Sequence, residues 1–219
     1  MRPARWPTST TAWDSSPGFA SPLGAARFAS ARSASLVWRT VTTAARTTIG
    51  VAIAVPEPWG GQLQEYRTTL GDSTAAGIPT HVTLMPPFEA GDLPAIERHL
   101  VEASSRACPF RIHLRGTGTF RPVSPVVFVT VAEGISACEQ LAVAVRRGPL
   151  ETEPTFPYHP HVTVAHHLPD DTLDKAFDEL SGFECRFVAD RFSLYVHDRQ
   201  DGWVPTRDFP LGASGRVRT

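Results

Sequence analysis

The sequence lacks long apolar runs, a strong net charge and paired cysteines. No stretch approaches the roughly 18 consecutive apolar residues that a membrane-spanning helix needs, so no membrane partner is expected. The 21 basic and 22 acidic side chains leave a net charge of −1, so any phosphate recognition must be local. Three scattered cysteines without CxxC spacing predict neither a disulfide framework nor a thiolate zinc site, and the expected compartment is the reducing cytoplasm.

The remaining composition is that of a globular protein with a distinct first segment. Of the 219 residues 42% are apolar, which is enough to bury a core in one large or two small domains. Residues 1–48 carry six arginines against the single acid Asp14, whereas the remainder carries 15 basic and 21 acidic side chains. We therefore expect a disordered leader over residues 1–47, a folded domain over residues 48–211 and a flexible tail over residues 212–219.

Two other interpretations of the leader stay open. Its Arg- and Ser-rich, acid-poor composition is also typical of organelle transit peptides. Alternatively, translation starts later, at a codon such as that of Val37 or Val41, and the leader belongs to a mis-assigned start. The sequence does not separate these interpretations.

Apolar periodicities predict a mixture of strands and helices without strict alternation. Strands are expected over residues 49–55, 80–84, 110–114, 126–131, 161–164, 187–196 and 203–209. Helices are expected over residues 63–70, 92–100, 135–145 and 173–180. Asp92 is expected to cap the second helix, and the second strand runs into Pro86 and Pro87. This mixed order predicts the α+β class.

A weak internal repeat is the most informative pattern. The sequence His-Val-Thr-Leu at residues 81–84 recurs as His-Val-Thr-Val at residues 161–164. Each copy is followed by an expected helix that starts at an aspartate and then by a short strand, over residues 110–114 and 183–187. Duplicated halves usually pack about a pseudo-twofold axis, so two copies of the motif are expected to face each other across a central cleft.

The repeated motif suits phosphodiester chemistry. Because residues i and i+2 of a strand share a face, His81 lies on the same side as Thr83, and His161 on the same side as Thr163. One imidazole can accept a proton from water while the other donates one to the leaving oxygen, since the ordinary pKa of histidine is near 6.5. The threonine hydroxyls can donate hydrogen bonds to phosphate oxygens. Neither a metal nor a covalent intermediate is required.

With these motifs the chain resembles the 2H phosphoesterase superfamily, in particular its 2'-5' RNA ligase-like branch. The resemblance covers about residues 48–211. It is carried by the two His-x-Thr-aliphatic motifs together with Pro86-Pro87-Phe88, Phe156-Pro157-Tyr158-His159-Pro160, Phe192-Ser193-Leu194 and Trp203.

The resemblance implies a fold and an activity. The fold is bilobal α+β, with two antiparallel-rich sheets and flanking helices around an open central cleft. The activity is hydrolysis or formation of 2',3'-cyclic or 2'-5' phosphodiesters without a metal or other cofactor. His81 and His161 are then the acid and base, Thr83 and Thr163 bind phosphate, and the resemblance favours His161 as the group that activates water. The expected protein is a cytoplasmic monomer that acts on RNA ends or small nucleotides, with no obligate protein partner.

Three further residues are assigned to the site. Many relatives carry an arginine two residues after the second motif, where this chain has His166, so His166 is expected to bind phosphate as a weaker, partly charged donor. Tyr158 and Phe88 are expected to stack on a base of the substrate. Arg111, His113 and Arg115 alternate along one strand face, which predicts either a solvated face or a basic lining for substrate phosphates.

Two alternatives come from other functional classes. The chain could be a nucleotide- or RNA-binding module without turnover. It could also be a histidine-ligated metallohydrolase, because His159, His161, His166 and His167 lie close together in sequence. No carboxylate stands at a convincing ligand spacing, and His159 is better interpreted as a residue at the rim of the site or behind it.

Overall fold

Two four-stranded antiparallel sheets form the framework of the molecule in the computed structural model, which describes residues 47–154 and 156–212. The first sheet has the spatial order β2 (His81–Ala90), β1 (Thr47–Ala54), β7 (Arg191–Asp198) and β8 (Gly202–Pro210). The second has the order β5 (His161–His166), β4 (Val126–Glu133), β3 (Phe110–Thr119) and β6 (Glu184–Ala189). Apart from Thr47 and Gly212, the expected leader and tail lie outside the described residues.

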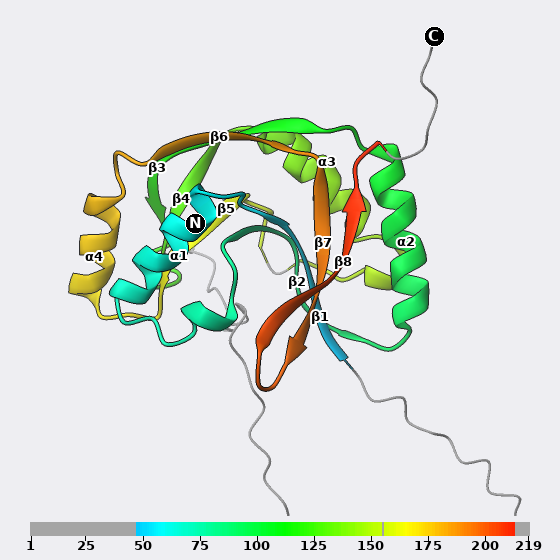
Figure 1. The fold of residues 1–219 in the computed structure, drawn as a ribbon, viewed down its shortest axis with the longest axis horizontal. Coiled ribbons are helices and arrows are strands. Elements are labelled where there is room, and N and C mark those ends of the chain that lie inside the picture. Colours follow the sequence, from blue (N-terminus) through cyan, green and yellow to red (C-terminus); the bar gives the residue numbers. More distant parts are fainter. Residues whose placement is uncertain (1–46, 155, 213–219) are drawn as a thin grey trace, which may run out of the picture.

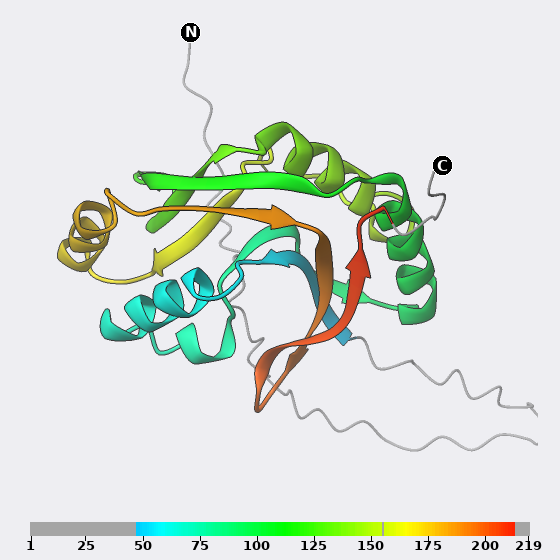
Figure 2. The same cartoon turned by 45° about the horizontal axis from the view of Figure 1, so that its top comes forward.

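In the part of the chain that the structure describes, four α-helices cover the sheets. They lie in two pairs at opposite ends of the molecule (Figures 1 and 2). They are α1 (Trp59–Thr69), α2 (Leu93–Arg106), α3 (Ile135–Val145) and α4 (Asp170–Glu179). Helices α1 and α4 pack on the second sheet, and α2 and α3 pack on the first. The α+β class with two antiparallel sheets and flanking helices is thereby confirmed. None of the described helices is both long and apolar enough to cross a membrane.

The two halves of the repeat exchange helices. Helix α1 follows β1 of the first sheet but contacts β5 of the second, and α3 follows β4 of the second sheet but contacts β2 of the first. A single large apolar core joins both sheets and includes Ile53, Leu84, Val129 and Val164. Each half therefore needs the other to bury its apolar surface.

Helix α2 shows how local sequence sets an element. The Asp92 side chain accepts a hydrogen bond from the Ala95 backbone N–H at 2.9 Å, which satisfies one of the unpaired donors at the helix start. Ile96 and Leu100 are buried at helical spacing. The expected cap is confirmed, and the helix continues to Arg106, six residues beyond the expected end.

Two expected strands are wrong in extent. Strand β2 continues through Pro86 and Pro87 to Ala90, because β2 is an edge strand and a missing N–H is tolerated there. The single strand expected over residues 187–196 is instead two strands, β6 and β7, which belong to different sheets. The chain changes sheet at Asp190, whose carbonyl accepts a hydrogen bond from the N–H of Leu211, the residue that follows β8.

The strands at 110–114 and 183–187 are not counterparts in the repeat. They are hydrogen-bonded neighbours in the second sheet, with Leu114 opposite Cys185. The spatial orders of the two sheets, β2-β1-β7-β8 and β5-β4-β3-β6, correspond strand by strand. The counterpart of β3 is therefore β7, the third strand of the first sheet. The motif strands β2 and β5 are thus equivalent edge strands.

Candidate active site

The two motif strands lie beside each other. β2 and β5 are the edge strands of their sheets and are in contact, so the sheets meet along these two strands. In β2 the side chains of His81 and Thr83 are half-buried while those between and after them are buried. Strand β5 repeats this pattern with His161 and Thr163. The expected pairing of each histidine with a threonine on one strand face is confirmed.

Each motif strand carries a β-bulge directly after its threonine. In β2, Thr83 pairs with Ala52 of β1 and Met85 pairs with Val51, so Leu84 is an extra residue between them. Both Leu84 and Met85 are buried. In β5, Thr163 pairs with Phe128 of β4 and Ala165 pairs with Val127, so Val164 is the extra residue. A bulge of this kind turns two consecutive side chains to one face of the sheet.

The bulge in β5 determines where His166 lies. His166 stands opposite Val126, and Thr163 stands opposite Phe128, which is on the same face of β4 as Val126. Cross-strand partners share a face, so His166 lies on the face of Thr163 and His161. In a strand without the bulge, residue 166 would lie on the opposite face. The structure therefore brings His166 onto the motif face; its contact with phosphate stays a prediction.

The imidazole of His81 is held at both nitrogens. Its Nδ1 lies 2.5 Å from the Pro79 carbonyl, and its Nε2 lies 3.1 Å from the Thr83 hydroxyl oxygen. A carbonyl can only accept, so Nδ1 carries the hydrogen and Nε2 of the neutral ring is an acceptor. In this tautomer the Nε2 lone pair accepts the hydrogen of the Thr83 hydroxyl, so that hydrogen bond must be released before Nε2 can take a proton from water.

His161 has the same local arrangement in a different environment. Its Nδ1 donates to the His159 carbonyl at 2.7 Å, again two residues earlier in the chain. Its ring packs against Phe120 and Phe128, with centroids 4.9 Å and 5.0 Å away. His159 lies behind it, with ring centroids 6.1 Å apart. The second imidazole is thus oriented by one carbonyl and surrounded by aromatic rings.

Both histidines are held neutral in the unliganded protein. The pKa of His81 is lowered to about 4, chiefly by burial; the nearby charges of Arg67 and protonated His161 act in the same direction, against the raising effect of the Pro79 carbonyl. Burial likewise lowers the pKa of His161 to about 4, with the His159 ring acting in the same direction. The effect of His161 on His81 is consistent with the contact between β2 and β5, which brings the two motif strands together.

Tyr158 connects the two motif strands. Its hydroxyl donates to the Thr83 carbonyl at 2.9 Å. The guanidinium of Arg146 lies 4.9 Å above the Tyr158 ring, and its Nε donates to the Leu84 carbonyl at 2.6 Å. Burial raises the pKa of Tyr158, so its hydroxyl remains a donor. The segment before β5 is thereby fixed to β2; stacking of Tyr158 on a base stays a prediction.

Phe88 lies away from the two histidines. It stands opposite Ile49 on β1, whereas Thr83 stands opposite Ala52, and these two residues of β1 are on opposite faces. Its side chain packs against the apolar core. The structure does not bring Phe88 together with the motif face, and its contact with a base stays a prediction.

The row of basic residues on β3 is only partly solvated. His113 is 4% exposed and lies between two carboxylates, with Nε2 2.9 Å from Glu184 and Nδ1 3.5 Å from Glu133. Arg111 and Arg115 are exposed. The prediction of one continuous solvated or phosphate-binding row is therefore wrong for residue 113, because acidic partners enclose it.

The rings around His161 were not identified from the sequence. Phe128 lies on β4, across from Thr163, and a side chain at Gly118 would collide with it, because an added Cβ would stand 2.6 Å from a Phe128 ring atom. A glycine inside an expected strand is the signal that could have indicated this close packing.

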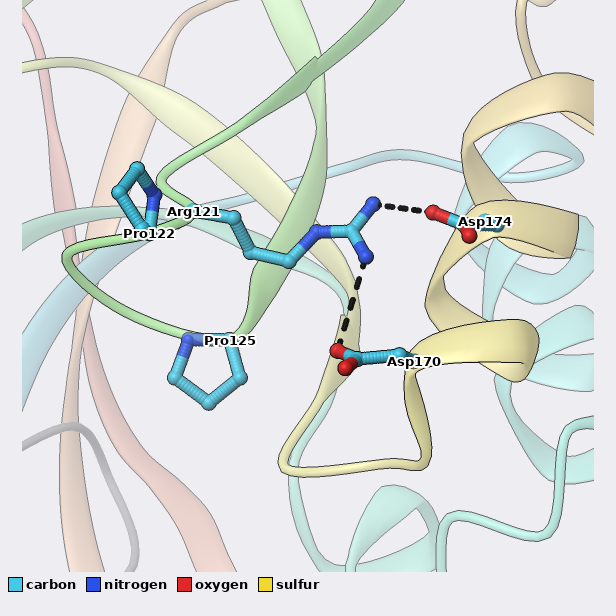
Figure 3. A pocket seen from close by; sticks show the side chains of 5 residues that line it. All are labelled: Arg121, Pro122, Pro125, Asp170 and Asp174. Carbon is cyan, nitrogen blue, oxygen red and sulfur yellow. Dashed lines mark hydrogen bonds and ion pairs between the residues drawn. The ribbon is translucent and has the colours of Figure 1, made fainter.

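A pocket lies beyond these rings at the turn between β3 and β4. Arg121 pairs there with Asp174 at 2.6 Å and Asp170 at 3.7 Å, with Pro122 and Pro125 beside it (Figure 3). Its single cation is matched by two carboxylates, so it offers no unbalanced positive charge to an anion. Within residues 47–154 and 156–212, no three histidine, cysteine or acidic side chains are grouped so that they could hold a metal ion.

Comparison with known proteins places this geometry in a family context. The model of the 2'-5' RNA ligase superfamily matches residues 55–201. A candidate phosphoesterase of Bacillus licheniformis is 33% identical over 146 residues, which cover 65% of this chain and 86% of that protein. One of Bacillus pumilus is 33% identical over 150 residues, which cover 66% and 86%. The crystal structure of Escherichia coli LigT complexed with NADP+ has the same fold, with a TM-score of 0.52, 20% identity and coverage of 76% and 99% of the two chains.

Proposed function

The chain belongs to the 2'-5' RNA ligase superfamily, and from this membership and the geometry of the two motifs we propose that it is a metal-independent phosphodiesterase. Its substrates are RNA ends that carry a 2',3'-cyclic phosphate, or related cyclic or 2'-5' nucleotide phosphodiesters. We place this activity in residues 48–211. The observation that carries the proposal is the pair of histidines on adjoining strands, each with Nδ1 hydrogen-bonded to a carbonyl two residues earlier, so that Nε2 is the nitrogen that would exchange the proton.

The proposed reaction is an in-line displacement by water. One neutral histidine accepts a proton from water through Nε2 as the water oxygen bonds to phosphorus. The other donates a proton to the leaving ribose oxygen as its bond to phosphorus breaks. Protons balance, because the enzyme gains one from water and loses one to the product. Thr83 and Thr163 donate hydrogen bonds to the non-bridging oxygens, where negative charge grows.

Substrate binding supplies the protonated histidine. Both imidazoles are neutral in the free protein because their pKa values are lowered to about 4. A phosphodiester carries a negative charge, which raises the pKa of a neighbouring histidine and favours its protonated form. The free enzyme therefore binds the anion together with one proton, and kcat/KM is expected to fall as the pH rises above about 4, the value to which both pKa values are lowered.

A substrate panel tests this function. The purified full chain is incubated in EDTA with 2',3'-cyclic nucleotides, an RNA ending in a 2',3'-cyclic phosphate, a 2'-5' dinucleotide and the matching 3'-5' dinucleotide as control. We expect a cyclic or 2'-5' substrate to give a phosphomonoester and a free hydroxyl, with the products resolved by chromatography, while the 3'-5' control stays intact. Saturable binding without turnover would support a binding module instead. Activity that EDTA abolishes and zinc restores would support a metallohydrolase.

A further inference from the structure

A row of residues leads from His161 across the second sheet to an exposed arginine. His161 of β5 stands opposite Thr130 of β4. The Thr130 hydroxyl in turn donates a hydrogen bond to the carbonyl of Arg115 on β3. Neighbouring strands lie about 4.8 Å apart, so the Cα atoms of His161 and Arg115 are about 10 Å apart. An arginine side chain therefore begins only two strands away from the motif histidine.

Arg111 and Arg115 lie on the motif face of the second sheet, the face that carries His161. On β3 the two arginines are exposed and alternate with Ile112 and Leu114, which belong to the apolar core. On β5 His161 alternates with core residues in the same way. Successive side chains of a strand point to opposite faces, so the side chains that point away from the core in both strands share one face.

The two guanidinium groups are not neutralised by the carboxylates of this face. Glu133 and Glu184 lie on either side of His113, and Glu184 also pairs with Arg186 at 2.7 Å. In the part of the chain that the structure describes, neither residue 111 nor residue 115 has a side-chain ion pair or hydrogen bond. Two exposed, unpaired guanidinium groups on one face favour a ligand with several phosphates in a chain.

An exposed apolar side chain stands next to the first of these arginines. Val188 of β6 is opposite Arg111 and is 57% exposed. Bases of single-stranded RNA pack on side chains at an open surface, and an arginine plane stacks on them as well. Arg111 and Val188 together therefore suit a nucleotide better than they suit a simple anion.

The corresponding face of the first sheet is closed. Ala52 of β1, which stands opposite Thr83, is fully buried there, and Tyr195 and Trp203 are each only 4% exposed. Ile78, from the segment before β2, packs against these three residues. A chain that extends from the motif strands therefore finds an open surface on the second sheet and a filled one on the first.

We infer that the motif face of the second sheet binds the RNA strand on the 5' side of the cyclic phosphate, so that RNA ends are preferred over cyclic mononucleotides. This inference rests on the proposed function, which places the cyclic end between the two motif strands. Arg115, two strands from His161, binds the first phosphate beyond the reacting one. Arg111, four residues or about 13 Å further along β3, binds a later phosphate, and Val188 packs on a base.

Kinetics on two matched substrates test this inference. The full chain is assayed on a 2',3'-cyclic nucleotide and on a short single-stranded RNA that ends in the same cyclic nucleotide, and we expect a higher kcat/KM on the RNA. Arg115→Gln and Arg111→Gln should each lower kcat/KM on the RNA about tenfold, mainly through KM. The rate on the mononucleotide, which has no second phosphate, should change far less. Arg115→Lys keeps the charge and should recover part of the loss.

Arg98→Gln is the matched control. Arg98 is exposed and, among the described residues, has no ion pair, but it lies on α2, which packs on the first sheet. This variant should leave the ratio of the two kcat/KM values unchanged. Equal kcat/KM on both substrates in the wild type, equal losses on both in Arg115→Gln, or the same effect in Arg98→Gln would overturn the inference.

RNA binding gives a readout that does not depend on turnover. The affinity for the same RNA with a terminal 3'-phosphate is measured at several salt concentrations. Each phosphate contact contributes about 0.7 to the slope of log affinity against log salt concentration, so the slope should fall by about 0.7 in each single variant and by about 1.4 in the double variant. If the wild type turns over neither substrate, the proposed function fails, and this slope still decides whether the face binds RNA. An unchanged slope in the double variant would overturn the inference.

Discussion

Each motif histidine is oriented by a carbonyl only two residues earlier in the chain. The Pro79 and His159 carbonyls both receive an Nδ1 hydrogen, which leaves both Nε2 atoms as acceptors. This device is local, so a short motif is enough to encode it in either half of the chain. The environment of each ring is not local: Arg67 acts on one histidine, and Phe120 and Phe128 surround the other.

Gly118 is expected to matter through the ring of Phe128. In Gly118→Ala the new Cβ would stand 2.6 Å from a ring atom of Phe128, so the ring must move, and the ring packs against His161. Overpacking of this kind costs about 1–3 kcal/mol, and we expect a lower Tm together with a lower kcat. Gly182→Ala is the control, since a Cβ there meets nothing within 4 Å. Equal Tm and kcat in the two variants would contradict this interpretation.

At the level of elements, the two motif strands are edge strands with a bulge after the threonine. The bulges place Met85 and Ala165 in the core and turn His166 to the motif face. Two edge strands can meet only if something fixes their separation, and the Tyr158 hydroxyl on the Thr83 carbonyl is one such contact.

Tyr158→Phe tests that contact between the motif strands. The variant keeps the ring beneath Arg146 and removes the hydrogen bond to the Thr83 carbonyl, which is worth about 1 kcal/mol. We expect kcat to fall severalfold with little change in KM, because the strand is displaced while the ring remains. Tyr66→Phe removes a hydroxyl bound to Glu179 on α4 and serves as control. A rise in KM alone would instead indicate direct contact of the hydroxyl with substrate.

The limits of prediction from sequence follow the range of the interactions. Strand faces, the Asp92 cap and the pairing of His81 with Thr83 depend on neighbours along the chain, and they could be predicted. The change of sheet at Asp190 and the burial of Arg67 depend on segments far apart in sequence, and periodicity contains no trace of them. The prediction from the repeat is wrong at residues 183–187, because a similar spacing after each motif does not place the two strands at equivalent positions in the two sheets.

The molecule as a whole is held together by the exchange of helices between its halves. Because α1 packs on the second sheet and α3 on the first, a lobe cannot be removed without exposing the core of the other. The motif strands lie where the two sheets meet, so the stability of the fold and the geometry of the site depend on the same contacts.

Acid should destabilise the protein through its two motif histidines. Their pKa values are about 4 in the folded protein and near 6.5 when unfolded, so between these values the unfolded chain binds more protons. Above pH 6.5 both rings are neutral in the folded and the unfolded chain, and the free energy of unfolding does not depend on them. As the pH falls from 6.5 towards 4, the free energy of unfolding decreases by at most about 3 kcal/mol per histidine. Urea unfolding at pH 7 and pH 5 should show a smaller loss in His161→Asn than in the wild type. Equal losses would contradict the lowered pKa.

Removal of residues 1–46 should leave the folded protein and its activity intact. The first strand begins at Thr47, and the apolar core runs from Ile49 to Leu211. We expect an unchanged Tm and unchanged kcat/KM for the shortened chain. A second truncation that also removes β1 is the control, since β1 pairs with both β2 and β7 and its loss should abolish folding. A large loss of Tm on removing 1–46 alone would show that the leader is part of the fold.

The most direct test of a two-histidine phosphodiesterase is the rate of opening of a 2',3'-cyclic nucleotide by the wild type, His81→Ala, His161→Ala and the double variant, all in EDTA. We predict turnover by the wild type and a loss of about 10²- to 10⁴-fold in kcat for each single variant, as is typical of a general acid or base. The double variant should lose much less than the product of the two, because the residues act as a unit. Turnover close to that of the wild type in either single variant, with an unchanged circular dichroism spectrum, would contradict the proposed mechanism.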